Sequence, residues 1–319
     1  MEDRGSRHTR EAYAEALLEL GERDPRVVVM DADLASSTQT AKFRDRFPDR
    51  FFNCGVAEQN LMGTAAGLAA AGKVVFASTF AMFASGRAFD QVRNTIAYSD
   101  LNVKIVATHG GITVGEDGSS HQANEDIALM RVIPNMKVIV PADYYEAREA
   151  VKAAAELPGP VYVRLSRSKS PLIFDEDYLF DFGRARIMQP GSDITIFSTG
   201  LMTWHCLQAA EELEGDGVRA EVVHLATVKP LDHASVLESV SRTGLALSVE
   251  EHSVIGGLGG ALAELLAERA PVRLRRLGVP DVFGTSGPAE ELLEHFGLTG
   301  RHIAQAAREL LEERGVDPR

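Results

Sequence analysis

The chain has 319 residues, which is long enough for two domains, since an average domain has roughly 150 residues. Its 45% hydrophobic and 25% charged residues are typical of a globular protein and exclude a disordered or fibrous one. The net charge of -13 argues against a nucleic-acid partner, because a phosphate backbone requires a basic face.

The two cysteines, Cys54 and Cys206, form no CxxC pair, so we expect a reducing, cytoplasmic environment. The opening stretch MEDRGSRHTREAY is polar and charged, which excludes a secretory signal at that place. The most apolar long run, 56–75, is interrupted by Glu58, Gln59 and other polar residues. We therefore interpret it as a buried helix and not as a membrane span.

The first half of the chain alternates short apolar runs with amphipathic or alanine-rich stretches. The apolar runs predict strands at 26–33, 73–79, 102–110, 136–143 and 160–166. The stretches between them predict helices at 9–20, 56–71, 86–98 and 144–157. Strands that are apolar throughout and separated by helices indicate a parallel sheet covered on both faces.

This alternation lapses between Ser168 and Ser192, where proline, glycine and acidic residues predict a linker. Beyond it, strands are predicted at 193–200, 220–228, 244–252 and 272–280, separated by helices, with two further helices at the end. The predicted fold class is α/β with two domains that each contain a parallel sheet, at 1–175 and 190–319.

Ligands of open parallel sheets bind at the carboxyl ends of the strands, so the residues just after strands are the candidates for a site. One such stretch, ATHGGITVGEDGSSHQ at 107–122, places His109, Asp117 and His121 among glycines. Two imidazoles and an acid suit a transition metal, but their spacing matches no known ligand signature. Turn formation explains the glycines and gives no reason for the imidazoles. A substrate-binding loop is the third interpretation.

A second candidate is Glu58, which follows a predicted strand and begins a helix at once. A carboxylate in the first turn of a helix is stabilised by the dipole and can complete a cap, and this role alone would explain it. However, Gly63, Gly67 and a run of alanines indicate that this helix packs closely against another backbone. We expect the acid at its start to be desolvated and able to share a proton.

These stretches, taken together, resemble a known family. The sequences ADLASS, CGVAEQN, STFAMFASGRAFDQVRN, THGGITVGEDGSSHQ, MKVIVPAD, VRLSR, SVEEHSVIGGLGG and FGTSGP resemble, in this order, the C-terminal portion of transketolase, a thiamine-diphosphate enzyme. The resemblance covers nearly the whole chain. It implies a pyrimidine-binding domain at 1–175 and a transketolase C-terminal domain at 190–319.

The resemblance implies that Glu58 hydrogen-bonds N1′ of the cofactor's aminopyrimidine. Phe80 and Phe83 match the aromatic wall around the pyrimidine, although core packing would equally explain two phenylalanines. Asp33 matches an acid close to the cofactor at the subunit interface. Many transketolases have a further aromatic residue where this chain has Gly86, so we expect a more open pocket there.

The resemblance also implies that His109 and His121 act on the donor sugar near its reacting carbons and that Asp117 contacts the hydroxyl beside the carbonyl. Neutral imidazoles can relay protons to and from alkoxides, as ketol chemistry requires. The family's sugar-phosphate contacts match Arg10, Ser37 and Arg167. An arginine fork suits a phosphate monoester.

In the family, Mg²⁺ and the diphosphate are held by a GDG motif and a later asparagine on an N-terminal domain, and no such site is recognised in this chain. The GDG at 215–217 ends a predicted helix and is interpreted as a C-cap and turn. The IGGLGG at 255–260 lacks the spacing of a dinucleotide site. We therefore expect no metal ligands here and a split enzyme, inactive without an N-terminal partner subunit and assembled as a heterotetramer.

Three alternatives remain open. Deoxyxylulose-phosphate synthases share the GADG-type loop and the VEEH stretch, and the β subunits of 2-oxoacid dehydrogenases are separate chains of similar length. A non-catalytic interaction subunit is the third, although it gives no reason to keep Glu58, His109, Asp117 and His121 together. The donor and acceptor sugars also stay open: pentose-phosphate metabolism is the default, and a specialised biosynthetic pathway is the other choice.

Overall fold

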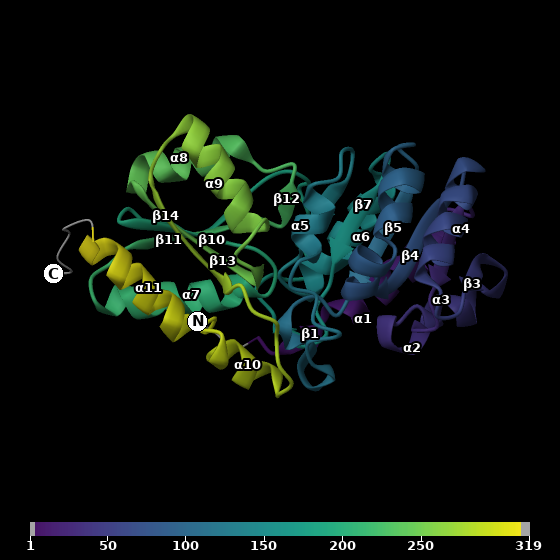
Figure 1. Ribbon diagram of the computed structural model, residues 1–319, viewed down its shortest axis with the longest axis horizontal. Helices are drawn as coiled ribbons and strands as arrows, with labels where there is room; N and C mark the ends of the chain where they lie inside the picture. Colours follow the sequence, from purple (N-terminus) through teal and green to yellow (C-terminus); the bar gives the residue numbers. More distant parts are fainter. Residues whose placement is uncertain (1–3, 314–319) are drawn as a thin grey trace.

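The computed structural model of the protein describes residues 4–313. Figure 1 shows two α/β units side by side, one coloured purple to teal and the other mainly green to yellow. Each is built around a twisted sheet that is covered by helices, which confirms the predicted fold class. Within the described range, no helix is both long enough and apolar enough to cross a membrane.

The first sheet has the strand order β12-β6-β7-β5-β4-β2-β3. Its members are β2 (Val27–Asp31), β3 (Phe51–Asn53), β4 (Val74–Phe80), β5 (Val103–Thr108), β6 (Lys137–Ile139), β7 (Val161–Arg164) and β12 (Thr227–Lys229). All neighbours are parallel except β12 and β6. Strands β2, β4, β5 and β7 are buried along their whole length, because helices cover both faces of the sheet.

The helices of this unit are α1 (Thr9–Arg23), α2 (Ala35–Thr38), α3 (Ala41–Arg46), α4 (Glu58–Ala70), α5 (Asp126–Arg131) and α6 (Tyr144–Glu156). Short 3-10 turns lie at η1 (Pro48–Arg50) and η4 (Ile112–Asp117). Helix α6 begins where predicted because the Asp143 carboxylate accepts a hydrogen bond from the backbone N–H of Glu146 at 3.0 Å.

The second sheet has the order β14-β13-β10-β11-β9. It contains β9 (Arg186–Gln189), β10 (Ile194–Ser198), β11 (Ala220–His224), β13 (Leu245–Ser253) and β14 (Arg273–Val279). Its helices are α7 (Met202–Gly215), α8 (His233–Thr243), α9 (Leu258–Arg269), α10 (Ala289–His295) and α11 (Gly300–Glu313). These strands and helices agree with the predicted alternation.

The segment predicted as a linker has more structure than expected. Its start forms β8 (Lys169–Pro171), which pairs antiparallel with β1 (Ser6–His8), and its later part supplies β9 to the second sheet. In addition, β12 lies beyond residue 190 but joins the first sheet through β6. A strand from the second half of the chain therefore belongs to the first sheet, and this backbone pairing links the two halves in a way that local composition could not reveal.

The helix predicted at 86–98 is also different. It consists mainly of π-helical turns, η2 (Phe83–Arg87) and η3 (Gln91–Ala97), in which N–H groups bond to carbonyls five residues earlier, as from Tyr98 to Arg93 at 2.9 Å. Such turns are rare and frequently occur at functional sites. Here they directly follow the end of β4.

Candidate functional site

The carboxyl ends of β4 and β5 bring the first pair of candidate residues together. The two strands are parallel neighbours, and Phe80 is in register with Thr108, so His109 follows directly beside Phe80. The Phe80 and His109 rings stack with centroids 3.7 Å apart and planes inclined by 20°. His109 has a positive φ of 62°, a conformation that costs energy for a non-glycine residue and that is common at binding sites.

Phe83 and His121 complete the aromatic group. The ring of Phe83 stacks on that of Phe80 at 5.8 Å, and the edge of His121 meets Phe83 at 5.4 Å. The structure therefore collects Phe80, Phe83, His109 and His121 into one cluster, although they come from two separate stretches of the chain. We call these four residues the aromatic cluster.

Glu58 lies at the start of α4 and is almost fully buried, with only 1% of its surface exposed. The expectation of a desolvated acid at this helix start is therefore confirmed. Its two oxygens both accept hydrogen bonds from Nη1 of Arg87, each at 2.9 Å. The guanidinium of Arg87 also lies 4.3 Å from the centre of the Phe83 ring. Arg87 thus connects Glu58 to the aromatic cluster.

His109 is surrounded by cations as well as by apolar groups. Burial, with the charges of Arg10 and Arg167 next in size, lowers the pKa of His109 to about 3. Its Nδ1 is 2.8 Å from the hydroxyl of Thr108. The ring is therefore neutral at physiological pH, which is the form that can both donate and accept a proton.

The two arginines reach this place through the β1–β8 pair, which ties the start of α1 to the segment after β7. Burial and the charge of Arg167 lower the pKa of Arg10, which shows that the two cations are close. Arg10 donates to the backbone carbonyl of Ser37 at 3.2 Å, and Arg167 donates to Glu116 at 2.9 Å. Two adjacent arginines form a suitable site for an anion.

Two predicted residues lie further out. Asp117 is exposed at the end of η4, and Asp33 is exposed after β2. The carboxylate of Asp33 accepts a hydrogen bond from Asn53 at 3.0 Å, which joins the ends of β2 and β3. Asp33 has a positive φ of 65°. No contact between these two acids and the aromatic cluster is found in the described residues.

The loop that carries His109 and His121 is held by the second domain. Ser119 donates to the carbonyl of Gly284, and Gln122 donates to that of Thr285 at 2.8 Å. Gly118 lies so close to Ser286 that a Cβ there would be 2.4 Å from its hydroxyl oxygen. The FGTSGP stretch of the second domain therefore packs directly on this loop.

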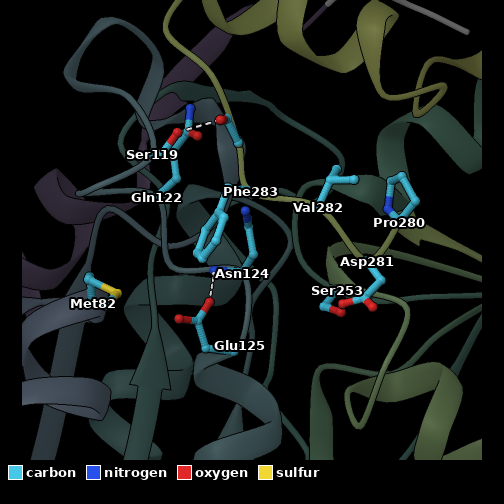
Figure 2. Close-up of a pocket in the computed structure, with 11 residues that line it drawn as sticks. Met82, Ser119, Gln122, Asn124, Glu125, Ser253, Pro280, Asp281, Val282 and Phe283 are labelled. Atoms are coloured by element: carbon cyan, nitrogen blue, oxygen red, sulfur yellow. Dashed lines mark hydrogen bonds between the residues drawn. The ribbon is translucent and has the colours of Figure 1, made fainter.

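A cavity of about 270 Å³ lies beside the loop, between the two domains. Figure 2 shows its lining residues, which come from both domains: Met82, Ser119, Gln122, Asn124, Glu125, Ser253, Pro280, Asp281, Val282, Phe283 and Gly284. Phe283 is 92% exposed and its ring lies near the centre of the group. Glu58, Phe80 and Phe83 do not line this cavity, so it is separate from the candidate cofactor residues. Met82, which lies between Phe80 and Phe83 in the sequence, is part of its lining.

Residues 4–313 contain no group of three or more His, Cys, Asp or Glu side chains placed to hold a metal ion. The GDG at 215–217 ends α7 and turns with a positive φ of 79° at Gly217, as predicted. At IGGLGG, the carboxylate of Glu250 accepts the N–H groups of Leu258 and Gly259 at 2.7 and 2.8 Å. The start of α9 is thus capped by the chain's own anion.

Sequence reasoning missed two side chains near the site. Arg87 follows Gly86 at the end of the π-helical turn 83–87, and no sequence motif indicated its pairing with Glu58. Glu251 lies in the VEEH stretch of β13 and touches the loop after His109. The resemblance at VEEH was the only sequence signal for this second residue.

The family models agree with the resemblance. The model described as the transketolase pyrimidine binding domain matches residues 6–171, and that of the transketolase C-terminal domain matches residues 183–303. Together they cover most of the chain.

Individual relatives match along their whole length. The chain is 52% identical to a protein named as a transketolase C-terminal section from Methanocaldococcus jannaschii, over 95% of this chain and 96% of that protein. It is 45% identical to the 6-deoxy-6-sulfo-D-fructose transketolase subunit SqwH of Clostridium sp. MSTE9, over 96% and 95%. A solved structure described as a split gene transketolase, inactive beta4 tetramer, superimposes with a TM-score of 0.89 at 52% identity, over 97% of this chain and 99% of that one.

Proposed function

The chain belongs to the transketolase family, and we propose that it is one subunit of a split enzyme that transfers a two-carbon ketol unit from a ketose phosphate to an aldose. The observation that carries this proposal is the joint placement of buried Glu58, after β3, and the aromatic cluster, after β4 and β5, at the same edge of the first sheet. These are the residues to which the resemblance assigns contacts with the cofactor and the donor sugar.

The residues present fit the aminopyrimidine of thiamine diphosphate. A heterocycle that is apolar on its faces and polar at its edge needs an aromatic wall and one buried acid beside it. Phe80 and Phe83 stack with planes only 17° apart, and buried Glu58 is connected to the Phe83 ring through Arg87. A Cβ at Gly86 would meet nothing nearer than the Met82 methyl at 3.4 Å, so this side of the wall is open.

When bound, thiamine diphosphate supplies the nucleophilic carbon that takes up the two-carbon unit of the donor. Glu58 would hold a proton at N1′ of the pyrimidine, and Phe80 and Phe83 would orient the ring and exclude water. For Glu58 to do so, Arg87 has to release it, because Nη1 engages both oxygens of the carboxylate. The half-exposed side chain of Arg87 has room to move away.

The donor sugar would lie against the two imidazoles. His109 is neutral at physiological pH, so it can move a proton at a sugar hydroxyl without first losing one to solvent. His121 would face the same part of the sugar, and Asp117, at the exposed end of η4, would accept from its hydroxyl. Arg10 and Arg167, with the hydroxyl of Ser37, would bind the phosphate.

The diphosphate and its Mg²⁺ would be held by an N-terminal transketolase subunit, with two copies of each chain in a heterotetramer. Three observations support a partner: the described residues offer no metal cluster, the GDG forms a turn, and the relatives that match end to end are themselves sections or subunits of transketolases.

The identity of the ketose is a separate question. The relative from Clostridium sp. MSTE9 is named for a sulfonated fructose, whereas the resemblance in sequence gives pentose-phosphate metabolism as the default. A sulfonate and a phosphate are both tetrahedral anions, and Arg10 and Arg167 would suit either. We take xylulose 5-phosphate as the first donor to test.

The test compares the purified chain alone with the chain reconstituted with its N-terminal transketolase subunit. We expect transfer from xylulose 5-phosphate to ribose 5-phosphate only in the pair, and only with thiamine diphosphate and Mg²⁺. Tight cofactor binding and turnover by the chain alone would overturn the split. Pyruvate decarboxylation without ketose cleavage would move the chain to a deoxyxylulose-phosphate synthase or 2-oxoacid dehydrogenase type of chemistry.

A further inference from the structure

Glu251 is a buried acid of the second domain that reaches into the first. It lies on β13 with 3% of its surface exposed, and its Oε1 accepts the backbone N–H of Thr113 at 2.6 Å. Thr113 belongs to the loop between His109 and His121. A carboxylate from one domain is therefore bonded to the backbone of the candidate substrate loop of the other.

The loop is shaped to accept this carboxylate. Gly111 has a positive φ of 80°, and a Cβ added to it would lie 2.3 Å from Cδ of Glu251. Only glycine can adopt this conformation freely and leave space for the acid. Gly111 and Glu251 are thus complementary in shape, although 140 positions separate them in the sequence.

The same loop is fixed on its other side by the first domain. The N–H of Gly110 bonds to the carbonyl of Leu165 at 3.1 Å, and that of Gly111 bonds to the carbonyl of Ala123 at 2.9 Å. These bonds hold the backbone directly after His109. Between them and Asp117, Glu251 provides the side-chain acceptor for Thr113.

We propose that Glu251 is a positioning residue, which holds the 109–117 loop so that His109 and Asp117 meet the donor ketose in the productive geometry. This inference rests on the proposed function and adds a role for the second domain. A shift of about an ångström in groups that orient a substrate can reduce the rate by roughly a hundredfold. Fixing the loop is therefore a catalytic requirement as well as a structural one.

The charges around Glu251 make the contact dependent on pH. Arg164 on β7 donates to the backbone carbonyl of Glu251 at 2.8 Å and to the carboxylate of Asp126 on α5 at 2.9 Å, and Tyr162 donates to the same carboxylate at 2.7 Å. Burial, partly offset by Arg164 and the Thr113 N–H, raises the pKa of Glu251 to about 7. Below pH 7 the neutral acid is a weaker acceptor for Thr113.

The experiment uses Glu251→Ala and Glu251→Gln in the reconstituted pair, with Glu221→Gln as the matched control. Glu221 is equally buried in the second sheet, but its contacts are Arg242 and Thr195, away from the loop. We expect Glu251→Ala to raise the donor KM or lower kcat by at least about tenfold. Glu251→Gln, which keeps one acceptor oxygen, should restore part of the loss.

Three further readouts separate positioning from general stability. The affinity for thiamine diphosphate should change less than about twofold, because Glu251 contacts the 109–117 loop and not the candidate cofactor residues. In the chain alone, hydrogen exchange at the Thr113 amide should become faster in both variants, whereas Glu221→Gln should leave it unchanged. In wild type the donor KM should rise as pH falls through 7, and this rise should be flatter in Glu251→Gln.

The inference is overturned if a folded Glu251→Ala or Glu251→Gln variant keeps wild-type kinetics and wild-type exchange at Thr113. It is also overturned if Glu221→Gln reduces activity as much as Glu251→Gln does. Exchange in the chain alone needs neither cofactor nor turnover, so this readout remains valid if the wild-type pair shows no ketose cleavage. The absence of ketose cleavage by the wild-type pair would refute the proposed function. The contact between Glu251 and the loop would then be tested by hydrogen exchange at Thr113 alone.

Discussion

The two sides of the candidate site differ in what surrounds them. The loop with His109 and His121 is held from the second domain by Glu251, Gly284 and Thr285, so its shape is set within this chain. The side with Glu58 is covered by far fewer residues of this chain. Phe52 and Val56, just before Glu58, are 44% and 73% exposed, and a Cβ at Gly63 or Gly67 of α4 would meet nothing within 4 Å.

The difference indicates that one side of the candidate site is formed when the chain folds and the other when a partner chain binds. Apolar side chains and glycines that remain uncovered beside a buried acid such as Glu58 are typical of a surface that another chain covers. The substrate side should therefore be formed in the chain alone, whereas the cofactor side should be completed on assembly. Variants on the two sides should accordingly respond differently to the presence of the partner.

The largest expected effect is that of Glu58→Gln on the cofactor side. An amide cannot pass a proton to and fro as a carboxyl does, so kcat of the reconstituted pair should fall by about 10²- to 10⁴-fold. Glu312→Gln, at an exposed position of α11, is the control and should keep full activity. A scaffold protein that only activates its partner would tolerate Glu58→Gln, and such tolerance would contradict the proposed role.

The second prediction concerns the substrate side and can be made without the partner. Folding depresses the pKa of His109 from 6.5 to about 3, so the unfolded chain binds the proton more readily and stability is lost as pH falls below 6.5. By pH 4 the loss from this group should reach about 3 kcal/mol. His109→Asn should remove that part of the acid sensitivity in urea unfolding measured between pH 7 and 4.

An imidazole NMR signal provides the direct check on His109. Its ring should not titrate between pH 5 and 8 in the folded chain, because burial lowers the pKa of His109 to about 3, well below that range. Titration near pH 6.5 would mean that the ring is open to solvent. The substrate side would then not be preformed, and the comparison between the two sides would fail.

Much of the site follows from the sequence because strand ends meet at one edge of a parallel sheet. Phe80 directly follows the strand predicted at 73–79 and His109 lies at the end of the strand predicted at 102–110, and these two rings are in contact. Glu58 was correctly expected at the buried start of a helix. The roles of these residues came from the family resemblance, since periodicity alone cannot distinguish a binding phenylalanine from a core one.

The remaining features depend on contacts between distant segments. The pairing of β12 with β6 and the contact of Glu251 with Thr113 join residues far apart in the sequence, so no local pattern predicts them. Arg87, which contacts Glu58, ends the π-helical turn 83–87, whereas the sequence predicted an ordinary helix at 86–98. Local preferences decide elements, and tertiary packing decides which side chains meet.

A smaller effect is expected from Arg87→Ala in the chain alone. The substitution removes both hydrogen bonds to the buried Glu58 carboxylate, which should lower the free energy of unfolding by about 1–3 kcal/mol. The lower end applies because Arg87 is half exposed. Arg301→Ala, which breaks an exposed pair with Glu294, should change stability by less than about 0.5 kcal/mol.

In the reconstituted pair, Arg87→Ala should strengthen cofactor binding, although it destabilises the chain alone. Arg87 no longer competes for Glu58, so the apparent Kd for thiamine diphosphate should decrease. Calorimetric titration measures this directly. A higher Kd would mean that Arg87 stays at the site in the assembled enzyme and contributes to binding there.

The smallest effect is expected at Gly67, on the outer face of α4. Since a Cβ there would meet nothing within 4 Å, Gly67→Ala should stabilise the chain alone by about 0.5–1 kcal/mol through its higher helix propensity. Gly21→Ala is the contrasting control, because its Cβ would lie 2.6 Å from the ring of buried Phe43 and should destabilise the chain.

The effect of Gly67→Ala on assembly depends on whether the partner subunit covers this face of α4. If the uncovered face of α4 packs against another chain, the added methyl that stabilises the free subunit should weaken assembly, measured as a higher Kd by sedimentation or interferometry. Glycine on a helix face permits close approach of another backbone, and a methyl group prevents it. If Gly67→Ala stabilises the free chain and leaves assembly unchanged, the partner covers the cofactor side elsewhere, and Phe52 and Val56 become the residues to substitute next.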